Sequence, residues 1–189
     1  MKPVITAALL AAVATPALAY DLCDDLWFSR NQLYDRAGYC FSTALGQAVF
    51  DNEDCIGKEV TLEPGADALI AHIKWMEAEF DCDVDTTAST LDIPNLALRF
   101  RLEQVVAKSE FASGCLDWQG EPLPLRAGPR PEAEVISVVM PGQDIVWEYD
   151  TTGPPADWGF VTIYFEDQQI GLGWLVQELD HELCGRTAG

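Results

Sequence analysis

The sequence contains few histidines and few basic residues. Its only histidines are His72 and His181, and it has 11 lysines and arginines against 31 aspartates and glutamates. Neither histidine stands at a metal-ligand spacing from a cysteine, and no CxxC segment occurs, so no zinc site is expected. No GxSxG segment and no glycine-rich phosphate loop occurs either. A hydrolytic triad and a nucleotide site are therefore not expected, and no cofactor or metal is predicted.

Long apolar runs are absent beyond the N-terminus. The one run, over about residues 4–14, follows Lys2 and precedes Ala17-Leu18-Ala19, which has the small-x-small pattern of a signal peptidase site. A membrane-spanning helix needs about 20 apolar residues, so the run is too short for a permanent anchor. We expect residues 1–19 to be a cleaved signal peptide. Tyr20 would then begin a periplasmic or secreted protein with no membrane insertion after cleavage.

The excess of acidic residues limits the choice of partners. The expected signal peptide holds one basic and no acidic residue, so the exported chain would carry a formal charge of −21. Nucleic acids and anionic membranes would be repelled by this charge. A basic protein is a permitted partner, although an acidic surface also keeps an exported protein soluble without any partner.

The cysteines indicate a disulfide-linked protein. An even number of cysteines in an exported chain is typical of an oxidising compartment, and six cysteines predict three disulfides. All of them follow the expected signal peptide: Cys23, Cys40, Cys55, Cys82, Cys115 and Cys184.

Apolar residues at intervals of three and four predict helices over residues 21–37, 43–50 and 64–80. Cys23 and Cys40 would lie near opposite ends of the first helix, roughly 20 Å apart. They cannot pair with each other, because a disulfide needs Cα atoms within about 7 Å. If the short second helix returns antiparallel, it brings Cys55 to Cys23. The expected pairs are Cys23–Cys55, Cys40–Cys82 and Cys115–Cys184.

Residues 93–108 fit two patterns. Alternate positions from Leu96 to Leu102 are apolar, as in a strand, but a helix face through Leu98, Leu102 and Val105 is apolar as well. The leucine, alanine, arginine and glutamate residues of this segment favour the helix, which we expect here.

After Phe111 the chain changes to short β-rich runs separated by turn residues. The expected fold class is α+β, with a small helical domain over residues 20–92, a joining segment over 93–111 and a small all-β domain over 112–189. The β-rich runs cover residues 112–118, 122–127, 134–140, 143–149, 158–165 and 171–176.

The β-rich part contains four short blocks in order: LPLRAGP (123–129), VISVVMPG (135–142), WGFVTI (158–163) and GWL (173–175). Together they resemble the strands and turns of the bacterial Src-homology-3-like domain. The TTGPPAD segment and the bracketing pair of cysteines depart from that family. The resemblance implies a five- or six-stranded, partly open barrel. It also implies a non-catalytic appendage that binds cell-wall material or peptides in the cell envelope.

The stretch LWFSRNQLYDRAGYCF (26–41) carries an Arg30-Asn31 pair followed by Tyr34, Arg36 and Gly38. It resembles the YARHG family of bacterial extracytoplasmic domains, and looks closest to a cysteine-bearing relative. Alanine replaces the family's histidine here, so a proton-transfer role is not supported. A structural role explains each position: the tyrosine packs, Arg36 faces the helix end, and the glycine takes a left-handed cap. Arg30 lies on the apolar stripe and is expected to be half-buried against a carboxylate.

The acidic segment DCDVDTTASTLD has oxygen-bearing side chains at the spacing of a calcium loop. Thr86 stands where that loop needs glycine, so a solvated acidic loop is the preferred interpretation and calcium the alternative. The oxygen-bearing residues at that spacing are Asp81, Asp83, Asp85, Ser89 and Asp92.

The leading hypothesis is an exported, non-catalytic protein whose β-barrel binds a cell-envelope ligand. Aromatic side chains beside the TTGPPAD segment offer contact area, and Trp147, Tyr149, Trp158 and Tyr164 are the predicted binding residues. Tyr149 and Trp158 are expected to be solvent-accessible, whereas Trp174 is expected in the core. The alternatives are an acidic structural or inhibitory protein that binds a basic protein, and an enzyme with an unrecognised carboxylate site.

Overall fold

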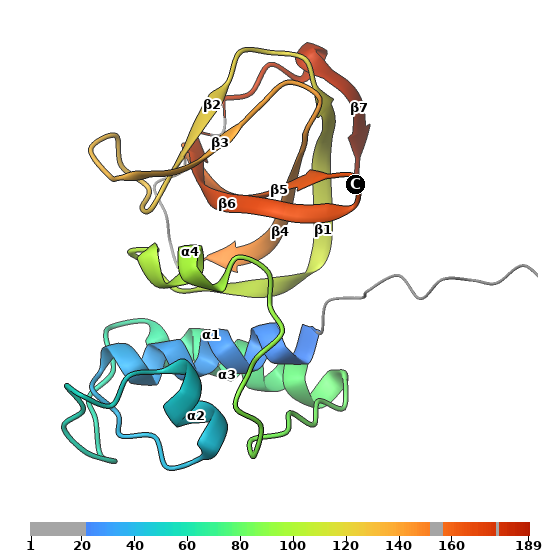
Figure 1. Cartoon of the computed structure of the whole chain (residues 1–189). Helices are drawn as coiled ribbons and strands as arrows, with labels where there is room; N and C mark the ends of the chain where they lie inside the picture. Colours follow the sequence, from blue (N-terminus) through green and yellow to red (C-terminus); the bar gives the residue numbers. More distant parts are fainter. Residues whose placement is uncertain (1–21, 152–156, 177) are drawn as a thin grey trace, which may run out of the picture.

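A computed structural model describes residues 22–151, 157–176 and 178–189. Three helices form one layer, a strongly curled antiparallel sheet forms the other, and a short fourth helix lies between them (Figure 1). The expected signal peptide and most of the TTGPPAD segment lie outside the described residues. None of the described helices is both long and apolar enough to cross a membrane.

Helices α1 (Leu22–Arg36) and α3 (Ala66–Glu79) pack antiparallel at the base of the molecule (Figure 1). Their facing stripes are apolar, and Leu26, Ile73 and Met76 are fully buried. Arg30 Nε lies 2.9 Å from Glu77 Oε1 in a half-buried ion pair. The predicted helices over 21–37 and 64–80 and the predicted carboxylate partner are thus confirmed.

Helix α2 (Ala44–Val49) begins at Thr43, whose hydroxyl accepts a hydrogen bond of 3.1 Å from the Gly46 amide. This short helix, predicted over 43–50, presents Phe50 to α1. The ring of Phe50 stacks on Phe28 of α1 at 5.6 Å and on Phe41 at 4.8 Å between centroids. Stacked aromatic rings therefore attach α2 and its flanking loops to α1.

Two of the three expected disulfide pairs are wrong. The pairs are Cys23–Cys82, Cys40–Cys55 and Cys115–Cys184, so only the last is as predicted. The helix that returns antiparallel beside α1 is α3, which brings Cys82 to the first turn of α1. The Cys40–Cys55 bond instead closes the loop between these two residues. Just beyond the loop, Gly57 O accepts a hydrogen bond of 2.8 Å from the Cys40 amide.

Residues 93–108 combine both of the patterns that the sequence shows. Helix α4 (Leu96–Arg101) is a single short segment, and strand β1 (Val106–Trp118) begins five residues after it. The helix predicted over the whole segment is therefore only partly right. Between the two elements the Glu103 amide donates to Ala127 O at 2.8 Å. This backbone bond to the sheet diverts the chain from helical geometry.

The sheet has seven antiparallel strands in the order β3-β2-β6-β5-β4-β1-β7. The six predicted runs each correspond to a strand, but the seventh strand, at the C-terminus, was not expected. The strands after β1 are β2 (Leu123–Arg126), β3 (Val135–Val139), β4 (Asp144–Thr151), β5 (Trp158–Phe165), β6 (Gln168–Val176) and β7 (Cys184–Ala188).

The sheet is open, so the expected barrel is wrong. Its ends are β3 and β7, and no strand pairing joins them within the described residues. Strand β1 has β4 along one edge and β7 along the other. The Cys115–Cys184 disulfide joins β1 to the start of β7, which is one end strand of the open sheet.

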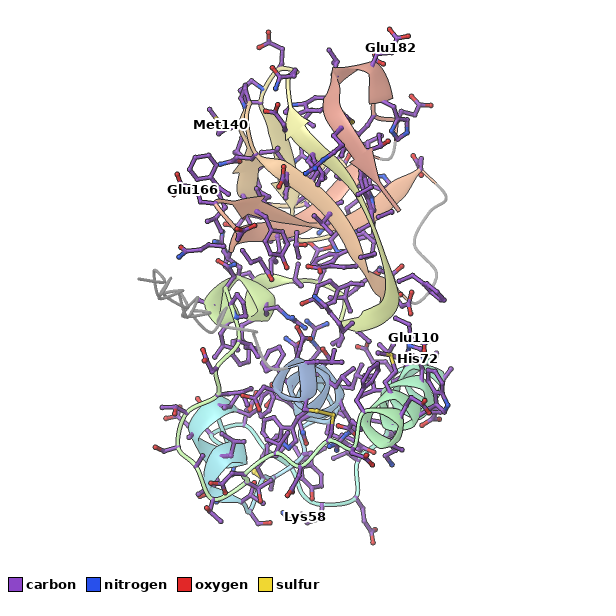
Figure 2. All side chains as sticks on the ribbon, turned by 90° about the vertical axis from the view of Figure 1, so that its right-hand side faces the viewer. Lys58, His72, Glu110, Met140, Glu166 and Glu182 are labelled. Atoms are coloured by element: carbon purple, nitrogen blue, oxygen red, sulfur yellow. A yellow bond between two sulfur atoms is a disulfide. The ribbon has the colours of Figure 1, made fainter. Side chains whose placement is uncertain are left out.

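The interior of the curl holds two apolar clusters, one of which includes the fully buried Trp174 predicted for the core. A third cluster joins the layers, because Val105 and Ala107 at the start of β1 pack with the α1 and α3 side chains. On the outside of this contact, His72 Nε2 of α3 lies 3.2 Å from Asp150 Oδ2 of β4. Figure 2 shows His72 and Glu110 at the level where the two layers meet.

The disulfide pairing predicts which thiol a single substitution releases. Cys23→Ser should leave Cys82 as the alkylatable cysteine, and Cys40→Ser should leave Cys55, because these are the bonded partners. Peptide mapping after alkylation without reduction measures this. The unsubstituted protein serves as control and should take up no label. Labelling of Cys55 in the Cys23→Ser protein would contradict the structure.

Candidate functional site

A buried ion pair joins the two layers. Arg99 of α4 donates from Nη1 to Asp25 Oδ2 at 2.7 Å and from Nη2 to Asp25 Oδ1 at 2.9 Å. Arg99 Nη2 also donates to the Ser29 hydroxyl at 2.8 Å. Asp25 and Ser29 lie on the inward side of α1, one turn apart. The forked guanidinium therefore bonds both oxygens of one carboxylate and the next turn of the same helix.

Tyr149 of β4 completes this network from the side of the sheet. Its hydroxyl donates to Asp25 Oδ2 and accepts from Arg99 Nη1 at 3.0 Å. The guanidinium lies over two rings, 5.2 Å from the centroid of Phe28 and 5.0 Å from that of Tyr149. One arginine from α4 thus contacts α1 and β4 together.

The protonation states in this network are set by burial and by charge. Burial alone would lower the pKa of Arg99, but the charge of Asp25 and the hydrogen bonds raise it above its usual range. The pKa of Tyr149 is raised well above its usual value, first by burial and then by the negative charge of Asp25. The network therefore contains an ionised pair and a neutral phenol.

This network is a joint between the layers and not a ligand site. Asp25 and Ser29 are 0% exposed and Arg99 is 1% exposed. A dissolved ligand cannot reach groups that are covered to this extent. Strongly shifted pKa values often mark functional sites, but structural ion pairs produce the same shifts.

The structure separates the four predicted binding aromatics. Tyr149 is 8% exposed in the joint, and Trp158 is 6% exposed in the core cluster around Trp174. The expectation that these two side chains are solvent-accessible is wrong. Both point into the concave face of the curled sheet, which apolar packing fills.

Tyr164, the third of these aromatics, belongs to a polar group on β4 and β5. Its hydroxyl donates to Glu148 Oε1 at 2.8 Å, and Thr162 Oγ1 donates to the same oxygen at 2.6 Å. Lys108 Nζ lies 2.8 Å from Glu148 Oε2. Burial, followed by the charge of Glu148, raises the pKa of Tyr164. The hydroxyl of this half-buried tyrosine is thus engaged by a neighbouring carboxylate.

Trp147 is the one predicted residue that lines an open groove. Its half-buried indole packs against the core cluster beside Cys115 on one side. The groove has a volume of about 290 Å³ and lies beside strands β1, β4 and β7. Its lining residues are Ser113, Gly114, Trp147, His181, Thr187 and Ala188.

Three of these side chains share one face of the sheet. Ser113 of β1 pairs with Trp147 of β4, and Cys115, two residues further along β1, pairs with Thr187 of β7. Paired residues, and residues two apart in a strand, point to the same side. The groove therefore lies on the same face of the sheet as the apolar core, next to the last core side chains.

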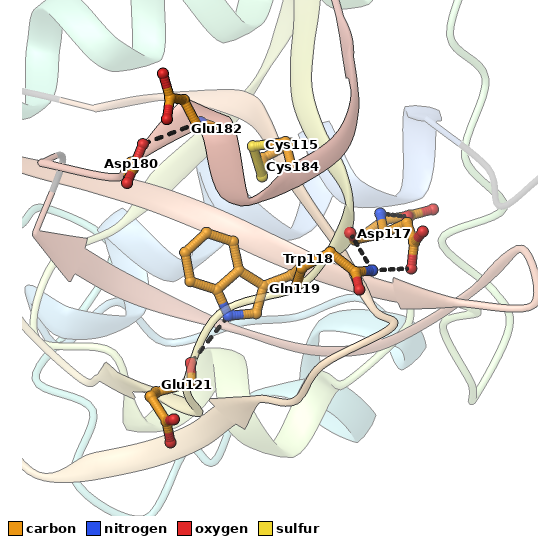
Figure 3. The surroundings of a disulfide bond; sticks show 9 residues. Cys115, Asp117, Trp118, Gln119, Glu121, Asp180, Glu182 and Cys184 are labelled. Atoms are coloured by element: carbon orange, nitrogen blue, oxygen red, sulfur yellow. Dashed lines mark hydrogen bonds between the residues drawn. A yellow bond between two sulfur atoms is a disulfide. The ribbon is translucent and has the colours of Figure 1, made fainter.

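The disulfide beside the groove helps to place its third polar side chain, His181. Figure 3 shows the Cys115–Cys184 bond and, near it, the Asp180 carboxylate. Asp180 Oδ1 accepts a hydrogen bond of 3.0 Å from the backbone amide of Glu182. This contact caps the short 3-10 helix η1 (His181–Leu183), which carries His181 to the groove. The sequence analysis did not identify His181 as a site residue. Its one relevant signal was the predicted Cys115–Cys184 pair, which places the segment around His181 against β1.

The acidic loop shows no calcium-type arrangement. The Asp85 carboxylate accepts hydrogen bonds from the Thr87 hydroxyl at 2.6 Å and from the Thr87 amide at 2.9 Å, and these two bonds, the hydroxyl first, lower the pKa of Asp85. Cys82 is bonded to Cys23, and the amide of Asp92 donates to Asp24 at 3.2 Å. Within the part of the chain that the structure describes, no three histidine, cysteine or acidic side chains are placed to hold a metal ion.

Comparison with protein families divides the chain near the end of α3. A family model described as "Domain of unknown function (DUF4453)" matches residues 81–189, and the YARHG domain model matches residues 2–78. The first match covers more than half of the chain. The chain belongs to the DUF4453 family. The expected YARHG resemblance is confirmed, whereas no comparison identifies a Src-homology-3-like domain. Searches of curated proteins and of solved structures gave no significant match.

The YARHG motif has structural contacts in this chain. Gly38 takes the left-handed conformation, with φ of +82°, and follows the last turn of α1. Tyr34 packs against the aromatic cluster around Phe28. Arg36 donates to Leu102 O at 2.6 Å and to Glu103 O at 3.0 Å. The motif thus connects the YARHG part to the segment of the DUF4453 part between α4 and β1.

Removal of the joint arginine should destabilise the protein strongly. We expect Arg99→Met to lower the free energy of unfolding by about 3–5 kcal/mol, because it leaves Asp25 as a buried, uncompensated charge. Arg101→Met is the matched control, since Arg101 lies on the same helix in an exposed ion pair with Glu134. It should cost less than about 1 kcal/mol. Urea unfolding measures both, and equal losses would contradict the assignment.

Tyr164 should make stability depend on alkaline pH. A phenol whose pKa is raised by folding stabilises the folded state fully below its unfolded pKa, and this contribution is lost as the pH rises above it. Between about pH 10 and pH 11 the free energy of unfolding should fall less steeply in Tyr164→Phe, by up to about 1.4 kcal/mol per pH unit. Urea unfolding at several pH values measures this, and identical slopes would refute it.

Proposed function

We propose that the chain is an exported, non-catalytic binding protein whose DUF4453 part binds a cell-envelope ligand in the groove beside Trp147. The ligand class is cell-wall material or a peptide. Export is supported by the pattern of residues 1–19, and by three disulfides that need an oxidising compartment.

This proposal rests on the position of Trp147, whose half-buried indole lines the groove. One side of its ring packs against the core cluster that contains Cys115, and the other side lines the groove. A large aromatic ring that is already immobile offers contact area at low entropic cost. Such rigid aromatic groups supply much of the binding energy at protein surfaces.

The YARHG part has a supporting role in this proposal. It contacts the start of β1 through apolar packing, and Asp25 of α1 accepts a hydrogen bond from Tyr149 of β4. The same two strands carry Ser113 and Trp147, and Trp147 lies two residues before Tyr149. Packing of these strands on the helical layer therefore helps to hold the groove residues in place.

Catalysis has less support. The fully buried carboxylate of Asp25 is neutralised by Arg99 and closed to solvent. Among the described residues that line the groove there is no aspartate, glutamate or cysteine. The described residues therefore support a binding role better than an enzymatic role.

Substitution of Trp147 should abolish ligand binding without unfolding the protein. The immobilised mature protein is incubated with solubilised envelope components, and retained material is then titrated by calorimetry. Trp147→Ala should weaken binding at least about 10-fold, since it removes a central aromatic contact. Trp75→Ala is the matched control, because Trp75 is 47% exposed on α3, away from the groove residues. Equal binding by both variants and the unsubstituted protein would overturn the proposal.

A further inference from the structure

We propose that the groove binds one ring of a neutral glycan. This inference rests on the proposed function and narrows its ligand class from cell-wall material or peptide to uncharged sugar. It is argued from the side chains, the charge and the dimensions of the groove.

The lining of the groove combines one apolar face with several hydrogen-bonding groups. Trp147 provides a flat aromatic ring, and Ser113, Thr187 and His181 provide two hydroxyls and an imidazole. A pyranose ring has the matching composition, with C–H groups on one face and hydroxyls around its rim. The C–H face can stack on the electron-rich face of the indole while the rim hydroxyls bond to the polar groups.

The charges in and around the groove favour a neutral ligand. In the part of the chain that the structure describes, no lysine, arginine, aspartate or glutamate lines the groove. A basic side chain would therefore be desolvated there without a carboxylate to pair with it. An anionic ligand would meet the field of residues 112–189, which hold three basic and 13 acidic residues. Neutral hydroxyl-bearing ligands avoid both penalties.

The dimensions of the groove suit one sugar ring. Strands β4 and β7 flank β1, and neighbouring strands lie about 4.8 Å apart, so Trp147 and Thr187 are separated by about 10 Å across the sheet and by two residues along it. The volume of about 290 Å³ lies at the small end of ligand sites. One ring can be enclosed, and the rest of a glycan chain would extend into solvent.

The groove residues are already held in position. Trp147 packs on the core, Ser113 and Thr187 lie on paired strands, and His181 is on a helix whose cap stands next to the Cys115–Cys184 disulfide (Figure 3). Little ordering is therefore needed when a ligand enters, which favours binding of a small ring.

The test uses soluble neutral oligosaccharides, namely trimers of glucose and of N-acetylglucosamine, with the mature, oxidised protein. Calorimetry and tryptophan fluorescence measure binding, and polygalacturonate and oligolysine are the charged comparison probes. A neutral trimer should bind, and the charged probes should bind at least 10-fold more weakly or not at all. Trp147→Ala should abolish binding of the trimer, and Thr187→Val should weaken it about 3- to 10-fold, the effect of losing roughly one hydrogen bond.

Two control variants and two negative outcomes make the result decisive. Trp75→Ala and Thr61→Val, both at exposed positions of the YARHG part, should bind the trimers like the unsubstituted protein. If no neutral trimer binds while an envelope peptide binds in a Trp147-dependent way, the glycan inference fails and the proposed function stands. If Trp147→Ala changes the binding of no envelope component, the proposed function fails as well.

Discussion

Arg99 and Asp25 place a full positive and a full negative charge where solvent is excluded, and the arrangement of the two layers depends on how these charges are satisfied. Removing them from water is costly unless each donor and acceptor finds a partner. The guanidinium meets the carboxylate with two hydrogen bonds, and Ser29 and Tyr149 add two more. Because these partners lie on α1, α4 and β4, the ion pair is complete only when the helical layer is seated on the sheet. A buried network of this kind fixes one arrangement even where its net contribution to stability is small.

A second constraint is the disulfide that fixes β7 to β1. It holds β7 as the end strand of the sheet, and the other end strand, β3, is not paired with it within the described residues. The core clusters fill most of the concave face but end beside Trp147. The groove therefore lies where the concave face is not filled. The Cys115–Cys184 disulfide directly follows η1, the 3-10 helix that carries His181 at the rim of the groove.

Sequence reasoning was accurate where a short segment carries its own signal. The apolar spacing of α1, α2 and α3 and the six short β-rich runs are local patterns, and the corresponding elements form where expected. It failed where the outcome depends on distant partners. The pairing of Cys23 depends on which helix returns beside α1. The burial of Tyr149 and Trp158 depends on which face of a curled sheet is filled, and spacing along a strand does not show which face that is.

The sequence by itself determined an acidic, disulfide-linked α+β chain with a YARHG-type helix, because charge, cysteine count and apolar periodicity are properties of residues and their near neighbours. Only the tertiary structure decided the joint and the groove. Asp25, Arg99 and Tyr149 are separated by 74 and 50 residues in the chain, and no local pattern links them. Likewise Trp147 and His181 come together only because β7 pairs with β1 and a disulfide holds it there. Such long-range contacts arise from packing and charge burial in the folded chain, which a linear pattern does not contain.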